Sequence, residues 1–187
     1  DQIRDIFSAL KWLNENLKDY PADMDNIFLA GDSAGGHFSC VTTAVNLNKD
    51  MQEDFGVSYC GFDFNAVAAI CPAVDLLSPN FLMNVNVPVL LGDKWRKSKF
   101  KKYLDVNRII SKDFPPFYVN TARNDFLKKQ CYKLKDILER NNIEHKFHDF
   151  DKPLSHVFNV VDPFSKYGDM ANTEIAEFFK ARMKTKV

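Results

Sequence analysis

The chain has 187 residues, of which 45% are hydrophobic and 27% charged, enough for one soluble domain with a sizeable core and too few for two. Lysine plus arginine and aspartate plus glutamate both total 25, so the charge balance does not favour a nucleic acid or an anionic membrane as partner. No apolar stretch approaches the roughly 18 residues of a membrane-spanning helix, so no span is predicted.

Cysteine usage and the N-terminus bear on the cellular setting. The four cysteines, Cys40, Cys60, Cys71 and Cys131, are dispersed and form no C-x-x-C pair. We predict reduced, mostly buried thiols of a cytoplasmic protein, with a disulfide pair as the alternative. The sequence begins at Asp1 without a methionine or a signal-peptide pattern, and we expect that an upstream segment has been removed.

Apolar spacing predicts the first elements. Residues 3–17 repeat apolar side chains every three or four positions, which predicts an amphipathic helix that ends before Pro21. The short apolar run 26–31 ends in glycine and predicts a strand that is buried on both faces. Residues 35–47 fit a second helix, and the polar, turn-rich residues 48–63 predict a surface excursion.

The rest of the chain continues the alternation of strands and helices. Three strands are predicted at 66–74, 115–122 and 143–150, and two helices at 126–141 and 172–183. Between the first two of these strands, residues 75–113 form an irregular excursion with apolar clusters at 81–83 and 87–91. The order predicts a single α/β domain over residues 1–187, in which helices flank a parallel, doubly wound sheet. Ligands of such sheets bind at the carboxyl ends of the strands.

A serine motif lies where the first predicted strand turns into a helix. Gly31-Asp32-Ser33-Ala34-Gly35 fits the pattern G-x-S-x-G, in which a strained turn projects the serine hydroxyl above the sheet. We expect both glycines to be required, because side chains at these positions would collide with the turn and with neighbouring strands. The Ala34 N–H, at the helix N-terminus, is placed to bind the oxygen that becomes charged in acyl transfer. Turns of this form also occur without catalysis.

Two later residues complete a catalytic arrangement. A serine hydroxyl is a poor nucleophile unless a histidine removes its proton and an acid orients that histidine. Asp125 follows the third predicted strand and His156 follows the fourth, which is the order Ser, Asp, His at strand ends that α/β-hydrolases use. The sequence therefore nominates Ser33 as nucleophile, Asp125 as acid and His156 as base.

Other interpretations of these residues stay open. Asp125 can simply cap the helix that follows it, and His156 can be a solvated loop residue. His37 lies one helical turn after Ser33, where it is expected to pack or to line the edge of a pocket rather than to act as base. Asp151 is a second, weaker nominee for the acid.

Two histidines and a basic run are not expected to belong to the catalytic arrangement. His145 and His148 lie on opposite faces of a predicted strand, so they suit neither the triad nor a shared metal site. We expect the basic run 94–102 to be solvated surface. The alternative is that its Trp95 and Phe100 cover the site.

Several segments together resemble a known family. "GDSAGG" after "ALKWLNENLKDY", followed by "AICPAVDL", "FPPFYVNTARNDFL" and "SHVFNV", is similar to carboxylesterases of the α/β-hydrolase fold, in the hormone-sensitive-lipase-like and acetyl- or feruloyl-esterase-like branch. The resemblance covers nearly the whole chain. It implies Ser33, Asp125 and His156 as the triad, and an excursion at about 75–113 that helps to form the acyl pocket. No metal or cofactor is expected.

The sequence departs from this family at one place. Family members carry upstream strands and a His-Gly-Gly loop that completes the oxyanion hole, and no such motif precedes Ser33. The chain therefore resembles the C-terminal part of a hydrolase, with an unpaired strand edge at 26–31 that invites self-association or pairing with an N-terminal segment. Loss of an oxyanion donor typically costs ~10²–10³ in rate, so we expect this chain to be weakly active or inactive alone.

The sequence thus predicts a serine carboxylester hydrolase for small or medium acyl esters. One alternative is a serine peptidase of the prolyl-oligopeptidase type, although those carry a tyrosine where this chain has Ala34. Another is a hydrolase-fold fragment that acts as a binding module without catalysis.

Overall fold

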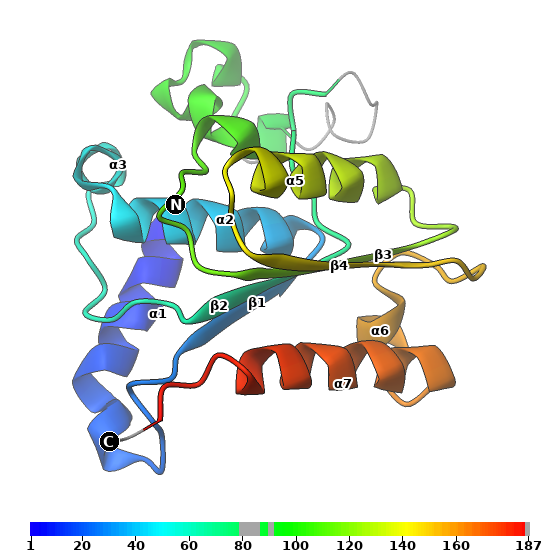
Figure 1. Ribbon diagram of the computed structural model, residues 1–187. Helices are drawn as coiled ribbons and strands as arrows, with labels where there is room; N and C mark the ends of the chain where they lie inside the picture. The colour runs from blue at the N-terminus through cyan, green and yellow to red at the C-terminus, as the bar shows by residue number, and fades with distance from the viewer. Residues whose placement is uncertain (79–86, 90–91, 186–187) are drawn as a thin grey trace.

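A computed structural model describes residues 1–78, 87–89 and 92–185 (Figure 1). Four parallel strands form one sheet in the order β1-β2-β3-β4: β1 (Phe28–Asp32), β2 (Ala66–Ile70), β3 (Phe117–Ala122) and β4 (His145–Phe150). The helices are α1 (Gln2–Asn16), α2 (Ala34–Leu47), α3 (Lys49–Phe55), α5 (Lys128–Arg140), α6 (Phe158–Val161) and α7 (Lys166–Lys180). Short 3-10 helices lie at η1 (Leu17–Asp19), η2 (Trp95–Lys97), η3 (Lys99–Leu104) and η4 (Val106–Arg108). The predicted α/β fold with a parallel sheet is confirmed.

The helices cover the two faces of the sheet. In Figure 1, α2 and α5 lie above the sheet and α7 lies below it. Alternate residues of β2 and β3 point to opposite faces, as a strand requires. Val67, Ala69, Phe117 and Val119 pack in the main core with residues of α1, α2 and α5, whereas Ala66, Ala68 and Tyr118 pack against Phe178 of α7. Both central strands are buried along their whole length, as expected for a sheet that is covered on both sides.

The strand register brings the carboxyl ends of all four strands to one edge. Asp32 pairs with Ile70 at the end of β1 and β2, and Ile70 pairs with Asn120 near the end of β3. Ser33 and Cys71 directly follow β1 and β2, while Asp125 and His156 lie on the segments that leave β3 and β4. The topology therefore gathers the nominated residues at the edge where such sheets bind ligands.

Some element boundaries differ from the sequence expectation. The predicted surface excursion at 48–63 contains α3, whose start is capped by the Asn48 side chain and whose end is followed by Gly56 in the left-handed conformation (φ 65°). The last helix begins at Lys166 rather than at 172, because the Ser165 hydroxyl caps it by accepting a hydrogen bond from the Gly168 N–H (3.1 Å). The short helix α6 was not predicted.

The second strand and the long excursion also need comment. β2 ends at Ile70 rather than at 74, since Cys71 takes a positive φ of 45° that no strand continues. Residues 79–86 and 90–91, which contain most of the predicted apolar clusters of the excursion, lie outside the described residues.

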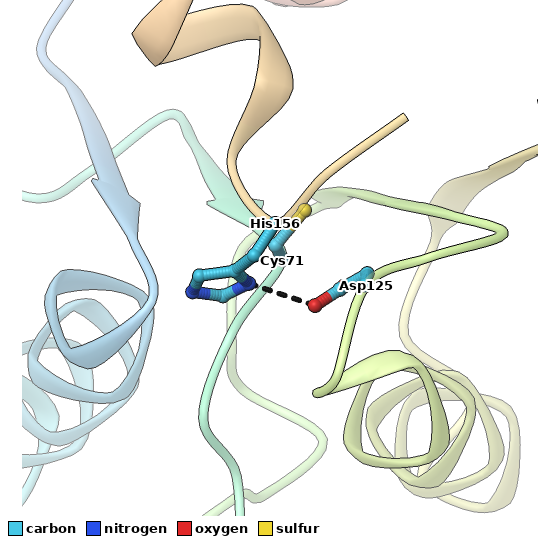
Figure 2. Close-up of side chains that lie close together, drawn as sticks. All are labelled: Cys71, Asp125 and His156. Carbon is cyan, nitrogen blue, oxygen red and sulfur yellow. Dashed lines mark hydrogen bonds and ion pairs between the residues drawn. The ribbon is translucent and has the colours of Figure 1, made fainter. Parts of the chain in front are cut away.

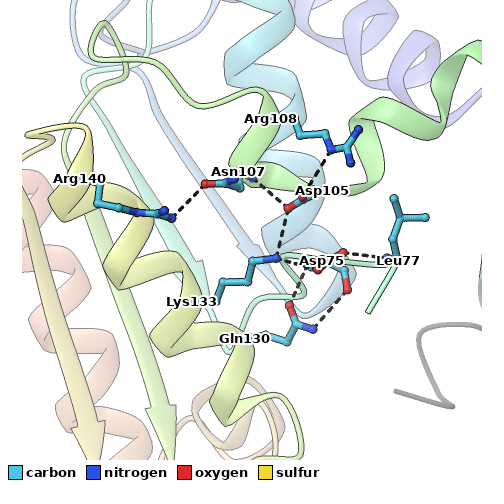
Figure 3. A network of polar contacts seen from close by, with 8 residues as sticks. All are labelled: Asp75, Leu77, Asp105, Asn107, Arg108, Gln130, Lys133 and Arg140. Carbon is cyan, nitrogen blue, oxygen red and sulfur yellow. Dashed lines mark hydrogen bonds and ion pairs between the residues drawn. The ribbon is translucent and has the colours of Figure 1, made fainter. Parts of the chain in front are cut away.

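Side chains of α5 join two segments of the excursion, around Asp75 and Asp105 (Figure 3). Asp75 and Asp105, near its two ends, form an isolated antiparallel bridge. The Lys133 ammonium contacts a carboxylate oxygen of each, at 2.7 Å and 3.3 Å. Gln130 accepts a hydrogen bond from the Asp75 N–H (2.8 Å) and donates one to the Asp75 carbonyl (3.3 Å). One turn of α5 therefore holds both ends of the excursion beside the strand edge.

Two compositional predictions can be compared with the structure. All four cysteines are free and buried, which confirms the prediction of buried thiols over a disulfide pair. Within the described ranges, no helix combines the length and the apolar character needed to cross a membrane.

Candidate active site

Ser33 sits in a strained turn between β1 and α2. Its backbone has φ 52° and ψ −114°, a conformation that costs a non-glycine residue about 1–3 kcal/mol. Three hydrogen bonds hold it: the Ser33 N–H donates to the Ile70 carbonyl (2.9 Å), and the Ser33 carbonyl accepts from the N–H groups of Ala73 (2.9 Å) and His37 (3.4 Å). The segment that follows β2 thus fixes the serine turn from the neighbouring strand.

The glycines around Ser33 differ in how tightly they are enclosed. A Cβ at Gly31 would overlap the Gly35 carbonyl group, and a Cβ at Gly36 would lie 2.7 Å from the Cβ of Pro72. By contrast, the nearest atom to a Cβ at Gly35 is a carboxylate oxygen of Asp32, at 4.0 Å. The expected requirement holds for Gly31 and is wrong for Gly35. The second crowded glycine is Gly36, because it packs against the chain that leaves β2.

Asp125 and His156 meet at the same edge (Figure 2). His156 Nδ1 lies 2.7 Å from Asp125 Oδ1, and the Asp125 side chain is fully buried while that of His156 is 16% exposed. The edge of the imidazole ring opposite Asp125 faces the pale blue ribbon of the turn between β1 and α2. His156 Nε2, on that edge, is buried and has no hydrogen-bond partner among the described residues. The ring is therefore held by the acid on one side and free on the side toward the serine turn.

The Asp125 carboxylate is held by more than the histidine. Its Oδ1 also accepts a hydrogen bond from the Leu127 N–H (2.9 Å), and its Oδ2 accepts one from the Thr121 hydroxyl (2.7 Å). The Cys131 thiol lies 3.6 Å from Oδ2. Burial by itself would raise the pKa of this carboxyl, yet the hydrogen bonds from His156, Thr121 and Leu127 lower the pKa below its ordinary value. Asp125 is thus an ionised carboxylate that is hydrogen-bonded to the His156 imidazole, and it also caps the turn that follows it.

Cys71 completes a compact group with this pair. The potential metal-ligating atoms of Cys71, Asp125 and His156 lie within 4.8 Å of one another, and within the described part of the chain this is the one such group. Burial and the Asp125 charge raise the pKa of the Cys71 thiol. To bind a metal ion, Cys71 would have to be in its thiolate form, which its raised pKa disfavours. The two other ligand atoms, His156 Nδ1 and Asp125 Oδ1, are already bonded to each other. The three residues therefore form a hydrogen-bonded acid–base pair, Asp125 and His156, beside the protonated thiol of Cys71.

The remaining nominees lie apart from this pair. Asp151, the alternative acid, is exposed and pairs with Arg123 instead (2.9 Å). His148 bonds to Glu174 of α7, while His145 approaches Glu139 of α5 on the other face (3.9 Å), as their alternation predicts. Neither histidine is joined to the group at the strand edge.

A cavity of about 130 Å³ lies beside the helix that begins at the serine turn. His37 of α2 lines it, together with apolar and aromatic residues of α1, α3 and the excursion, among them Phe100 and Tyr103. Burial lowers the pKa of His37 to about 4, so its imidazole is neutral at pH 7, and its Nδ1 has no partner among the described residues. His37 therefore lines a pocket, and residues of the excursion contribute to the same pocket wall.

The excursion also packs in one cluster with the segment that follows Asp125. Leu127, two residues after Asp125, packs with Ala73, Leu76, Val87, Trp95 and Leu104. Trp95 is thus buried against the acid-bearing segment, whereas the neighbouring basic side chains Arg96 and Lys97 are exposed.

The BD-FAE family model matches residues 1–138, about three quarters of the chain. This chain belongs to the BD-FAE family. The family assignment confirms the resemblance to α/β-hydrolase carboxylesterases. Among curated relatives, this BD-FAE member is 30% identical over 133 residues to the "Probable carboxylic ester hydrolase LipM" of Mycobacterium tuberculosis, covering 68% of this chain and 30% of LipM. It is 33% identical over 91 residues to the carboxylesterase NlhH of the same organism, covering 49% of this chain and 26% of NlhH.

Solved structures agree with this BD-FAE assignment. Esterase B from Lactobacillus rhamnosis matches with a TM-score of 0.89 and 27% identity, over 97% of this chain and 61% of the esterase. Esterase B inhibited by a tributyrin phosphonate matches equally well, at 28% identity and over 60% of its chain. The BD-FAE chain therefore spans less than two thirds of esterase B and about a third or less of LipM and NlhH.

Sequence reasoning missed several residues around the acid–base pair. Cys71 was read only as a buried thiol, although it follows a buried strand at the edge where ligands bind. Thr121 is the last residue but one of β3, four residues before Asp125. Position at a strand end was the available signal for both residues, and it does not reveal which partner each side chain contacts.

Proposed function

We propose that this chain is a serine carboxylester hydrolase in which Ser33 is the nucleophile, His156 the base and Asp125 the orienting acid. The observation that carries the proposal is the 2.7 Å hydrogen bond between His156 Nδ1 and Asp125 Oδ1 at the strand edge that also holds the strained Ser33 turn. Membership of the BD-FAE family supports the same chemistry.

The proposed reaction follows from the two sides of the imidazole. His156 Nε2 takes the Ser33 hydroxyl proton as the serine oxygen attacks the ester carbonyl, and the Asp125 carboxylate stabilises the imidazolium that forms. The proton then passes to the departing alcohol, and water releases the acid from the acyl-enzyme by the same route. The Ala34 N–H is the first of α2, where helix N–H groups have no partner within the helix, and it donates to the oxyanion.

We propose small or medium acyl esters as substrates. Esterase B, which shares 28% identity with this chain, is inhibited by a C4-C4 tributyrin phosphonate. The cavity next to α2, at about 130 Å³, is of a size for a short acyl chain rather than a long one, and its wall combines apolar side chains with Asp1, Gln2, Arg4 and His37. The excursion residues Phe100 and Tyr103 form part of its wall and are the side chains through which acyl length would be selected.

We further propose that the free edge of β1 pairs with a strand of a segment like the one that esterase B carries beyond the matched region. β1 is the first strand of the sheet order, with β2 on one side only. Its residues are half-buried or exposed, whereas those of β2 and β3 are buried. Sedimentation of the purified chain tests this proposal, because a stable dimer would mean that a second copy occupies the edge instead.

Labelling with a fluorophosphonate probe tests the catalytic proposal. The expected result is covalent labelling of the chain that is abolished in Ser33→Ala and strongly reduced in His156→Gln, together with faster turnover of an aryl acetate or butyrate than of an aryl decanoate. A preference for a proline-linked amide would indicate a peptidase instead. Absence of labelling in a folded wild-type chain would contradict the proposal and favour a binding module.

A further inference from the structure

Backbone strain is concentrated around the candidate site. Four described residues other than glycine have a positive φ: Ser33, Cys71, Asn142 and Val157. Asparagine tolerates this conformation, but a β-branched valine strongly avoids it. Val157 directly follows His156 and lies in the left-handed region, at φ 50° and ψ 36°. Such strain persists only where the surrounding structure holds it, so the question is which contacts hold Val157.

The short helix α6, which begins directly after Val157, is tied down by asparagine side chains. Asn159 of α6 is 1% exposed. Its side-chain Nδ2 donates to Asn172 Oδ1 (2.9 Å), and Asn172 Nδ2 donates to the backbone carbonyl of Asn159 (3.0 Å). Asn120 Nδ2 donates a longer bond to Asn159 Oδ1 (3.5 Å). The helix is therefore fastened to α7 on one side and to β3 on the other.

The same asparagines reach the acid-bearing side of the site. Asn120 is fully buried on β3, five residues before Asp125, and its Oδ1 accepts a hydrogen bond from the Cys71 N–H (3.3 Å). One buried chain of amides thus links the end of β2, the acid-bearing strand and the turn that carries His156. A hydrogen-bonded network of this kind restrains the positions of its members.

We infer that Asn159, through Asn120 and Asn172, is a positioning residue of the proposed triad. It holds Val157 in the left-handed conformation, and that conformation directs the His156 imidazole at Asp125. This inference rests on the proposed hydrolase function, but its first consequence is geometric: the 2.7 Å bond between His156 and Asp125 depends on Asn159.

Replacing Asn159 with leucine keeps the side-chain size and removes both hydrogen bonds of the side-chain amide, while the bond from Asn172 to the Asn159 backbone carbonyl remains possible. Val157 is then free to return to a conformation that valine prefers, and the His156 ring turns away from Asp125. In Asn159→Leu we expect kcat for an aryl butyrate to fall at least tenfold, with KM within twofold of the wild-type value. Asn172→Ala removes both hydrogen bonds that join α7 to Asn159 but does so at a half-buried position, and it serves as a second variant with a loss of kcat if Asn159→Leu does not fold.

Asn46 provides a matched control. It is 4% exposed, donates to the Phe62 carbonyl (3.0 Å) and accepts from the Cys60 N–H (3.0 Å). It lies near the end of α2, away from the turn that carries His156. Asn46→Leu should lower the melting temperature as much as Asn159→Leu does, while kcat below the melting transition stays at the wild-type value.

A second substitution separates positioning from stability. Glycine takes the left-handed conformation without a steric penalty. Adding Val157→Gly to Asn159→Leu should therefore restore kcat several-fold, while adding it to Asn46→Leu should leave kcat unchanged. A loss of kcat in Asn159→Leu that glycine at position 157 does not relieve would contradict the part assigned to Val157.

The readout that does not require activity is the proton on His156 Nδ1. A proton shared with a buried carboxylate gives a downfield ¹H NMR signal, which His156→Gln identifies by its loss. We expect the signal in the wild type, its weakening in Asn159→Leu and its return in the double variant. If Ser33 proves unreactive, the proposed function fails while this signal still tests the positioning. Wild-type kcat and an unchanged signal in Asn159→Leu, or in folded Asn172→Ala, would overturn the inference.

Discussion

Replacing Gly31 with alanine tests the geometry of the serine turn most directly. The added Cβ would overlap the carbonyl group of Gly35 and lie 2.7 Å from the Ser39 hydroxyl oxygen. The obstacle is the backbone of the first turn of α2, and Ser39 Oγ fastens that turn further by donating to the Gly35 carbonyl (2.9 Å). The Gly35 carbonyl is a backbone group and cannot move aside as the end of a flexible side chain would. The clash must therefore open the contact between β1 and α2.

The expected cost follows from this rigidity. An extra methyl group in a packed site costs typically about 1–3 kcal/mol, and a backbone obstacle places Gly31→Ala at the upper end, at about 3 kcal/mol. In a chain of this length, that loss lowers the melting temperature by roughly 6–12 °C. Gly36→Ala should behave similarly, because its Cβ would lie 2.7 Å from the Cβ of Pro72.

Gly35→Ala is the matched control for this prediction. The nearest atom to its Cβ would be 4.0 Å away, and alanine favours a helix over glycine by up to about 1 kcal/mol. Urea denaturation followed by circular dichroism should show Gly35→Ala at or above wild-type stability and Gly31→Ala well below it. A Gly31→Ala midpoint equal to the wild-type value, or an equal loss in both variants, would refute the reasoning.

Three further predictions concern single side chains. Burial lowers the pKa of His37 to about 4 in the native state, whereas the unfolded chain has the ordinary value of 6.5. Between these pH values the unfolded state binds a proton that the native state does not, so the free energy of unfolding should fall by about 2 kcal/mol between pH 8 and pH 5. His37→Gln should remove most of this fall in urea midpoints taken at the two pH values, and an unchanged pH dependence would count against it. Thr121→Val removes a hydrogen bond to the Asp125 carboxylate and should lower the free energy of unfolding by about 1.5–3 kcal/mol at pH 7, whereas Thr121→Ser should lower it much less. Because the pKa of Asp125 is lowered in the native state, the difference in stability between the two variants should shrink in acid, where Asp125 takes up its proton; denaturation at both pH values tests this. Lys133→Met removes two partly exposed ion pairs, each worth up to about 1 kcal/mol, and should speed proteolysis of the excursion. Equal digestion rates in the variant and the wild type would contradict the role of Lys133 in holding Asp75 and Asp105 together.

Local patterns in the sequence carried the prediction of the fold. Apolar runs at 26–31 and 66–74 predicted strands that are buried on both faces, and the structure has β1 and β2 there. β2 is buried along its whole length as predicted, but the prediction is wrong for β1, whose residues are half-buried or exposed because it lies at the end of the strand order. The boundaries were less accurate where a single cap decides them, as at Ser165, which starts α7 earlier than its apolar spacing suggests. Caps depend on one side chain, whereas periodicity sums over many residues.

The sequence by itself determined the fold class and nominated Ser33, Asp125 and His156, because parallel strands bring their carboxyl ends to one edge and those residues follow strands. The tertiary structure alone decided that Gly36 rather than Gly35 is crowded, and that Cys71, Thr121 and the buried asparagines surround the acid–base pair. The physical reason is that these properties arise from contacts between different elements. Cys71 and Asn120, for example, are 49 positions apart and meet only because β2 and β3 pair in register.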